Sequence, residues 1–205
     1  MITIIDYGAG NIRSIEKALQ YLGEEVMLTG DPEKIRKAEK LILPGVGNFG
    51  DAMQHLNSRH LPEAIREAVS RQVPLMGICL GLQLLFEKSE ESPGTAGLGI
   101  LPGEILRIPD APGLKIPHMG WNSLHLQNGG RLLKGIPEEA YVYFVHSYYL
   151  QAAQEEIVKA TTEYGVRIHA VVEKGNVFAA QFHPEKSSRS GLAILRNFAA
   201  VGKEV

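Results

Sequence analysis

The chain has 205 residues, of which 44% are hydrophobic, 21% charged and 7% aromatic, and its formal net charge is −2. These values suit a globular protein with one core of ordinary size and give no electrostatic reason to expect nucleic acid as a partner. No apolar run approaches the roughly 20 residues that span a membrane, and a single cysteine excludes an intramolecular disulfide and a cysteine-cluster metal site. The N-terminus lacks the basic flank and cleavage site of a signal peptide, so we expect a cytoplasmic protein.

The first half of the sequence alternates apolar runs with helical patterns. Residues 2–6 predict a strand that stops at Gly8-Ala9-Gly10, and Asn11 is a plausible N-cap for a helix that ends at Gly23. The next predicted elements are a helix opened by Asp31-Pro32, a strand at 41–43, a helical region from about 51 to 71 broken at Pro62, a strand at 73–78 and a helix at 80–88.

The second half is richer in strands. We predict strands at 104–108, 122–126, 141–145, 156–162, 167–172 and 177–182, followed by a helix from about 189 to 201. Strands separated by helices and then consecutive strands indicate an α/β fold: a mixed, mostly parallel central sheet flanked by helices, with an additional antiparallel strand region. Without a repeat or a linker, we expect residues 1–205 to form a single domain.

Cys79 lies where a strand is predicted to become a helix, in Gly77-Ile78-Cys79-Leu80-Gly81. A nucleophile between two glycines at such a junction is typical of a nucleophile elbow. The N-terminus of the following helix favours a thiolate, and the Leu80 N–H is suited to bind an oxyanion. Taken alone, the pentapeptide also fits a small cysteine buried at the end of a strand.

A thiol nucleophile needs a base, and the base needs a group that fixes its tautomer. Of the seven histidines, only His183 ends an apolar strand and is followed two residues later by a carboxylate, Glu185. We expect Pro184 to hold the tripeptide extended, which would place both side chains on the same side of the chain. As an isolated motif, His-Pro-Glu would usually be a surface loop.

A glycine-rich segment, Pro44-Gly45-Val46-Gly47-Asn48-Phe49-Gly50, follows a buried strand. Glycine permits positive φ and lets backbone N–H groups face a ligand. The segment is either a simple turn before a helix or the second oxyanion donor that an acyl-transfer enzyme needs.

Residues 78–83 (ICLGLQ) together with His183-Pro184-Glu185 resemble the class I (triad) glutamine amidotransferases. Within that class, four further stretches resemble the glutaminase subunits of imidazole glycerol phosphate synthases: 44–53 (PGVGNFGDAM), 116–122 (IPHMGWN), 143–149 (YFVHSYY) and 181–187 (QFHPEKS). Residues 6–12 (DYGAGNI) also fit, and the resemblance covers about residues 4–198.

The resemblance implies that L-glutamine is the substrate and that Cys79, His183 and Glu185 form the catalytic triad, with Cys79 carrying a γ-glutamyl thioester. The other implied positions are an oxyanion hole from Gly45, Val46, Gly47 and Leu80, and substrate contacts from Gln83, His146, Ser147 and Tyr148. Neither a metal nor an organic cofactor is expected.

The resemblance further implies a heterodimer with a (β/α)₈-barrel cyclase, which would use the ammonia in histidine biosynthesis to make imidazole glycerol phosphate and aminoimidazole carboxamide ribotide. The implied interface positions are Asn11, Trp121, Tyr143 and Lys186. From the sequence alone, Trp121 could equally be a core residue and Lys186 an ordinary surface lysine.

Three other functions compete with this interpretation. The chain could serve another synthase of the same class, for anthranilate, aminodeoxychorismate, carbamoyl phosphate or GMP, although these lack the IPHMGWN and PGVGNFGDAM stretches. It could be a free-standing cysteine hydrolase that needs no partner. A nucleotide-binding module is suggested by Gly8 and Gly10 but fails because Arg13 stands where the third glycine belongs.

Overall fold

The computed structural model describes residues 1–127 and 129–202, and within them one large sheet runs through the molecule. Its strand order is β2-β1-β3-β4-β13-β12-β11-β8. The strands from β2 to β13 in that order are parallel, and the remaining pairs are antiparallel. The bounds are β1 Ile2–Ile5, β2 Val26–Thr29, β3 Leu41–Gly45, β4 Leu75–Cys79, β8 His125–Leu126, β11 Val158–Glu163, β12 Arg167–Lys174 and β13 Val177–Ala180.

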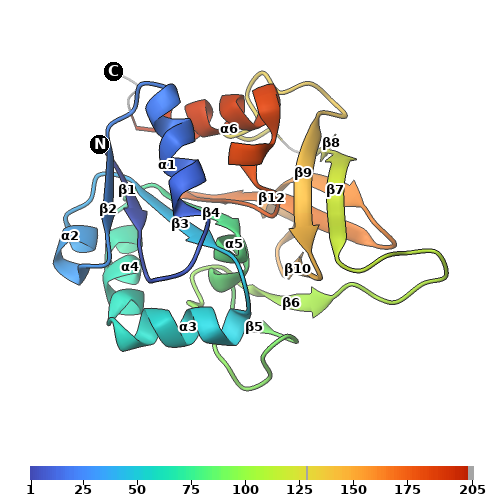
Figure 1. Ribbon diagram of the computed structural model, residues 1–205, viewed down its shortest axis with the longest axis horizontal. Helices are drawn as coiled ribbons and strands as arrows, with labels where there is room; N and C mark the ends of the chain where they lie inside the picture. The colour runs from blue at the N-terminus through green and yellow to red at the C-terminus, as the bar shows by residue number, and fades with distance from the viewer. Residues whose placement is uncertain (128, 203–205) are drawn as a thin grey trace.

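Helices cover both faces of this sheet. Figure 1 shows α1 and α6 on one side of the sheet and α3 and α4 on the other. The helix bounds are α1 Ile12–Tyr21, α2 Pro32–Arg36, α3 Phe49–Ser58, α4 Leu61–Ser70, α5 Leu80–Leu84 and α6 Ser188–Ala200, with 3₁₀ turns η1 Glu155–Ile157 and η2 Pro184–Lys186.

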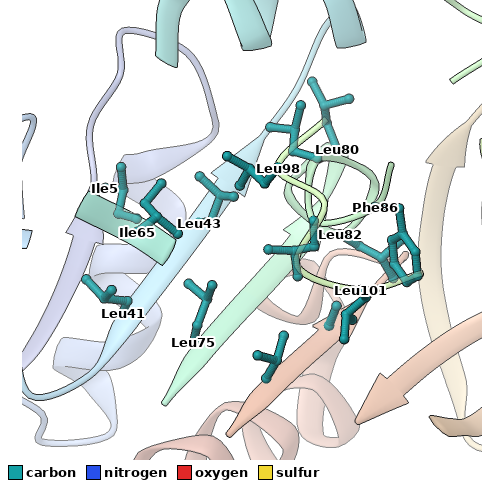
Figure 2. Close-up of a cluster of buried hydrophobic side chains, with 14 of the residues drawn as sticks. Ile5, Leu41, Leu43, Ile65, Leu75, Leu80, Leu82, Phe86, Leu98 and Leu101 are labelled. Atoms are coloured by element: carbon teal, nitrogen blue, oxygen red, sulfur yellow. The ribbon is translucent and has the colours of Figure 1, made fainter. Parts of the chain in front are cut away.

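Each face of the sheet is packed by its own apolar cluster, because side chains alternate along a strand. Leu41 and Leu43 of β3 join the cluster under α3 and α4, part of which Figure 2 shows, whereas Ile42 between them joins the cluster under α1 and α6. This confirms the expected α/β fold with a mixed sheet between helices.

Two small sheets extend the second half of the chain. One has the order β10-β6-β5, and the other pairs β7 with β9 in an antiparallel ladder. Figure 1 shows β7 and β9 side by side, and buried side chains of β9 join the apolar cluster under α1 and α6. The bounds are β5 Lys88–Ser89, β6 Gly103–Arg107, β7 His118–Ser123, β9 Tyr141–His146 and β10 Tyr148–Ala152. The antiparallel pairs β6–β10 and β7–β9 form the predicted additional antiparallel region, whereas β5 pairs with β6 in parallel.

Several element predictions were wrong in detail. Strands β2 and β10 were not predicted, because β2 is only half-buried and β10 follows β9 after the single residue Ser147. The predicted strand 122–126 is divided between β7 and β8, and the helix predicted at 80–88 ends at Leu84.

The helical break also lies earlier than Pro62. His60 adopts a left-handed conformation with φ of 56°, and α4 begins at Leu61 with Pro62 in its first turn. Proline suits that position because the first N–H groups of a helix have no intrahelical acceptor.

Candidate active site

Cys79 lies at the junction of β4 and α5 in a conformation that non-glycine residues rarely adopt, with φ of 55° and ψ of −113°. Such strain persists only where the surrounding structure enforces it, and it is concentrated at functional sites. Gly77 and Gly81 make the turn possible. A Cβ atom on Gly77 would lie 2.7 Å from the Gly81 carbonyl oxygen, and one on Gly81 would collide with the Leu43 carbonyl. The junction therefore has the tight geometry expected of a nucleophile elbow.

A cavity of about 290 Å³ opens beside Cys79. This volume lies at the lower end of the range for small-molecule sites, which suits a ligand the size of an amino acid. The lining residues are Val46, Gly47, Cys79, Leu80, Gln83, Glu91, Pro117, Val145, His146, Ser147, Tyr148 and His183. Chain segments that are far apart in the sequence thus meet at one site.

His183 and Glu185 form a buried pair within this site. His183 Nδ1 lies 2.9 Å from Glu185 Oε1, and the two side chains are 2% and 0% exposed. The expected extended tripeptide is wrong, because Pro184–Lys186 forms the 3₁₀ turn η2. Pro184 starts this turn, and the turn itself brings the carboxylate back to the ring of the residue that precedes it.

The charge on His183 is set by its two neighbours. Burial lowers the pKa of His183, but hydrogen bonding and charge interaction with Cys79 and Glu185 outweigh burial and raise the pKa to about 9. The ring is therefore an imidazolium at neutral pH. A cation beside a cysteine stabilises the thiolate form, which is the nucleophilic one.

Backbone contacts hold His183 against β9. The His183 N–H donates to the Tyr143 carbonyl at 3.0 Å, and the Ser187 hydroxyl donates to the His183 carbonyl at 2.6 Å while accepting from the Tyr143 N–H at 3.0 Å. Sequence analysis included Ser187 as the last residue of the 181–187 stretch but gave it no role.

Gln83 lies in the cavity wall with its amide orientation fixed. Its Nε2 donates to the Tyr148 carbonyl at 3.0 Å and to Gln181 Oε1 at 3.2 Å. The side-chain oxygen of Gln83 is then the atom left to accept from a ligand. The other substrate-contact candidates, His146, Ser147 and Tyr148, also line the cavity.

Three of the four oxyanion candidates line the cavity, and Gly45 does not. Gly45 packs instead against the elbow, where a Cβ atom would lie 2.6 Å from the Gly81 nitrogen. Gly47 has a φ of 96°, which favours glycine. The buried Tyr7 hydroxyl donates to the Pro44 carbonyl at 2.9 Å and so anchors the start of this segment. Tyr7 belongs to the DYGAGN stretch but was not identified as a site residue.

Glu91 is a second residue that sequence analysis missed, since it lies in a loop without a recognisable motif. Among the described residues, it is the one carboxylate that lines the cavity. Burial raises its pKa, while the hydrogen bond from the Phe49 N–H at 2.8 Å acts in the opposite direction. A carboxylate in this position can bind an ammonium group.

Three of the four interface candidates contact one another at Tyr143, and the fourth, Asn11, contacts Glu185. Trp121 is 52% exposed, so it is not a core residue, and its ring meets the Tyr143 ring edge-on at 6.1 Å. Lys186 Nζ lies 5.9 Å from the centre of the Tyr143 ring, and the Asn11 amide donates to Glu185. Neither Trp121 nor Tyr143 lines the cavity beside Cys79.

Comparison with known proteins identifies the class that the fold and the site define. The class-I glutamine amidotransferase family model matches residues 3–201, so the chain belongs to that family and is a glutamine-hydrolysing enzyme. A solved structure described as a glutamine amidotransferase superposes with a TM-score of 0.78, at 21% identity and 99% coverage of each chain. The structure of PurLQS from Thermotoga maritima superposes with a TM-score of 0.76, at 23% identity, and the match covers 98% of this chain and 97% of that chain. At such identities these two structures show the fold alone.

Curated relatives define the branch of the class. Imidazole glycerol phosphate synthase subunit HisH from Moorella thermoacetica is 54% identical over 197 residues, covering 96% of this chain and 93% of that protein. Imidazole glycerol phosphate synthase subunit HisH 1 from Methanococcus maripaludis is 48% identical over 202 residues, covering 97% of this chain and 98% of that protein. The chain is thus a member of the HisH group, the glutaminase subunits of imidazole glycerol phosphate synthase. This confirms the resemblance drawn from the motifs and disfavours the other synthases of the class.

No group of three or more His, Cys, Asp or Glu side chains in residues 1–127 and 129–202 could hold a metal ion. In the same ranges, none of the helices has the length and apolar character needed to cross a membrane.

Proposed function

We propose that Cys79, His183 and Glu185 are the catalytic triad with which the chain hydrolyses L-glutamine. The observation that carries this proposal is the strained Cys79 beside an imidazolium whose other ring nitrogen is held by a buried carboxylate at 2.9 Å. A nucleophile and a proton donor then line one cavity of suitable size, and the orienting carboxylate lies behind the proton donor.

In the proposed reaction, the Cys79 thiolate attacks the side-chain amide carbon of glutamine. Backbone N–H groups of Leu80 and of the Val46-Gly47 segment stabilise the oxyanion. His183 donates its proton to the leaving nitrogen, the C–N bond breaks, and ammonia departs from a γ-glutamyl thioester. His183 next removes a proton from water, and the resulting hydroxide attacks the thioester carbon. The C–S bond breaks, which releases glutamate and restores the Cys79 thiolate beside the protonated His183.

Recognition of free glutamine requires groups for its ammonium and its carboxylate. We assign the ammonium to Glu91 and the side-chain oxygen of Gln83, because both are acceptors that line the cavity. The N–H groups of the 146–148 segment are the candidate donors for the carboxylate. Burying such charged groups without partners would be costly, so the site selects a free amino acid over an uncharged amide.

The partner in this proposal is a cyclase subunit, with which the chain would form an imidazole glycerol phosphate synthase, the enzyme that the names of the HisH relatives print. The cyclase subunit would consume the ammonia. The proposed docking region is the surface formed by the exposed Trp121 and Lys186 with the half-buried Asn11 and Tyr143. In the isolated chain, we expect the peptide around Val46 to withhold one oxyanion donor, which typically costs 10²–10³ in rate. A nucleotide-loaded partner would restore that donor by favouring the other peptide orientation.

The test measures glutamine turnover by the full chain alone, with a cyclase subunit, and with that subunit plus its nucleotide substrate. We expect a large rise in kcat only when both are present, and a loss of at least about a hundredfold for Cys79→Ser in the same mixture. Full activity of the chain alone would instead identify a free-standing hydrolase. Retention of activity by Cys79→Ser would exclude Cys79 as the nucleophile.

A further inference from the structure

Two buried histidines outside the triad face each other across the β7–β9 pair. His118 and His146 are cross-strand partners, and His118 Nδ1 lies 3.0 Å from His146 Nε2. His118 is 2% exposed and His146 is 6% exposed. The His118 ring is stacked between the rings of Phe144 and Tyr164, with ring centroids 4.7 Å and 3.9 Å away. It therefore has little freedom to turn.

The groups at the two ends of this contact fix both tautomers. His146 Nδ1 lies 2.8 Å from the Tyr148 carbonyl, which can only accept, so Nδ1 carries the hydrogen. In a neutral ring Nε2 is then an acceptor, and His118 Nδ1 must donate to it. His118 Nε2 is left to accept, and the Asn122 amide nitrogen lies 3.3 Å away.

Asn122 is itself oriented by the backbone. Its Oδ1 accepts from the Ser123 N–H at 2.8 Å, and its Nδ2 donates to the Glu163 carbonyl at 3.0 Å. Every donor and acceptor in the series is therefore assigned by a backbone group at one end or the other. The result is one ordered relay, defined as Asn122, His118, His146 and the Tyr148 carbonyl.

Both rings in the relay are neutral around pH 7. Burial lowers the pKa of His118 to about 4, and burial together with the nearby His118 and His183 lowers that of His146 to about 3. Protonating His146 would set its Nε2–H against the His118 Nδ1–H at 3.0 Å, and protonating His118 would set its Nε2–H against the Asn122 amide group at 3.3 Å.

The relay ends on an atom that belongs to the glutamine cavity. The Tyr148 carbonyl accepts from both His146 Nδ1 and Gln83 Nε2, and all three residues line the cavity, whereas His118 does not. The hydrogen bond from His146 to the Tyr148 carbonyl therefore holds the cavity wall in place, and it requires the Nδ1–H tautomer of His146. His118, which lies outside the cavity, fixes that tautomer by donating to His146 Nε2.

We propose that His118 is a positioning residue for glutamine binding: by donating to His146 it fixes the tautomer that holds the Tyr148 carbonyl and, through it, Gln83 in place. This inference rests on the proposed function of the cavity. It concerns substrate binding and not the chemical step, because His146 and Tyr148, the relay members that line the cavity, are proposed substrate contacts and do not belong to the proposed triad.

A matched pair of variants separates positioning from bulk packing. His118→Phe keeps a ring between Phe144 and Tyr164 but removes the donor. His118→Asn keeps a donor near the Nδ1 position with a smaller side chain. His118→Phe removes one buried hydrogen bond on which the contacts of His146 and the Tyr148 carbonyl depend. We therefore expect it to raise the KM for glutamine about tenfold and to change kcat less than about threefold. His118→Asn should return KM to within about threefold of the wild type.

The second readout is the tautomer of His146, from the ¹⁵N chemical shifts of its ring in the full-length chain. We expect the Nδ1–H tautomer in the wild type and in His118→Asn, and a mixture with Nε2–H in His118→Phe. An Nε2–H tautomer in the wild type, an unchanged KM in a folded His118→Phe, or equal damage in both variants would overturn the proposal. If His118→Phe does not fold, the wild-type tautomer and the His118→Asn kinetics decide the question. Failure of the proposed function would look different, since the wild type would then not turn over glutamine.

Discussion

The side-chain amide of Asn11 donates a hydrogen bond of 3.0 Å to Glu185 Oε1, the same oxygen that lies 2.9 Å from His183 Nδ1. Asn11 precedes α1, where an asparagine would ordinarily cap the helix, but its side chain makes no cap hydrogen bond. A residue expected at the partner surface therefore also contacts the carboxylate that orients the proposed base.

Asn11→Ala should lower kcat about tenfold or more, because a hydrogen bond to a charged group contributes about 1.5–3 kcal/mol. The measurement is glutamine turnover with the cyclase and its nucleotide at saturation, so that weaker docking does not contribute. Arg13→Ala is the matched control, since Arg13 lies on the same helix with an 81% exposed side chain. A normal kcat at saturating partner would show that Asn11 acts only in docking.

The charge on His183 makes part of the stability depend on pH. Its pKa is raised above the ordinary 6.5 to about 9, so the imidazolium stabilises the fold fully below about pH 6.5 and this contribution is lost as the pH rises through about 9. The difference in unfolding free energy between the wild type and His183→Gln should therefore shrink between pH 7 and pH 10. Denaturant unfolding at several pH values measures it.

An NMR titration gives the same pKa directly. The midpoint for His183, identified by its absence in His183→Gln, should lie near 9 and should fall in Glu185→Gln, which removes one of the groups that raise it. A wild-type midpoint near 6.5 would contradict the assigned imidazolium.

Tyr7→Phe should destabilise the protein by about 1–3 kcal/mol, because the buried Pro44 carbonyl loses its hydroxyl donor. It should also reduce kcat, since Pro44 leads directly into the Val46-Gly47 segment. Urea unfolding and turnover kinetics test both effects. Tyr141→Phe is the control, as Tyr141 is 61% exposed. A loss of stability with unchanged kcat would limit Tyr7 to a structural role.

Glu91→Gln should raise the KM for glutamine about tenfold while leaving kcat nearly unchanged, because it removes a charge-assisted contact to the ligand ammonium. Asp51→Asn is the control: Asp51 lies near Glu91 but does not line the cavity. Glutaramate, the glutamine analogue without the ammonium, provides the discriminating measurement. The wild type should strongly prefer glutamine to glutaramate, and the variant should lose most of that preference. A preserved preference would assign the ammonium to another group.

The sequence by itself determined the features that depend on short stretches of chain. The elbow at Cys79 is specified by five consecutive residues, because a sharp strand-to-helix turn needs glycines on both sides of the nucleophile. The pairing of His183 with Glu185 was also predictable, because the two residues are only two positions apart, although the 3₁₀ turn that brings them together was not. Alternating apolar runs were sufficient for the α/β class.

The tertiary structure alone decided which distant residues support that local geometry. Asn11 and Glu185 are separated by 174 positions, and Tyr7 and Pro44 by 37. Glu91 reaches the cavity from a loop, and His118 meets His146 only because β7 and β9 pair in that register. The order and register of strands, set by packing of the whole core, bring these side chains together, and no local pattern in the sequence records that order.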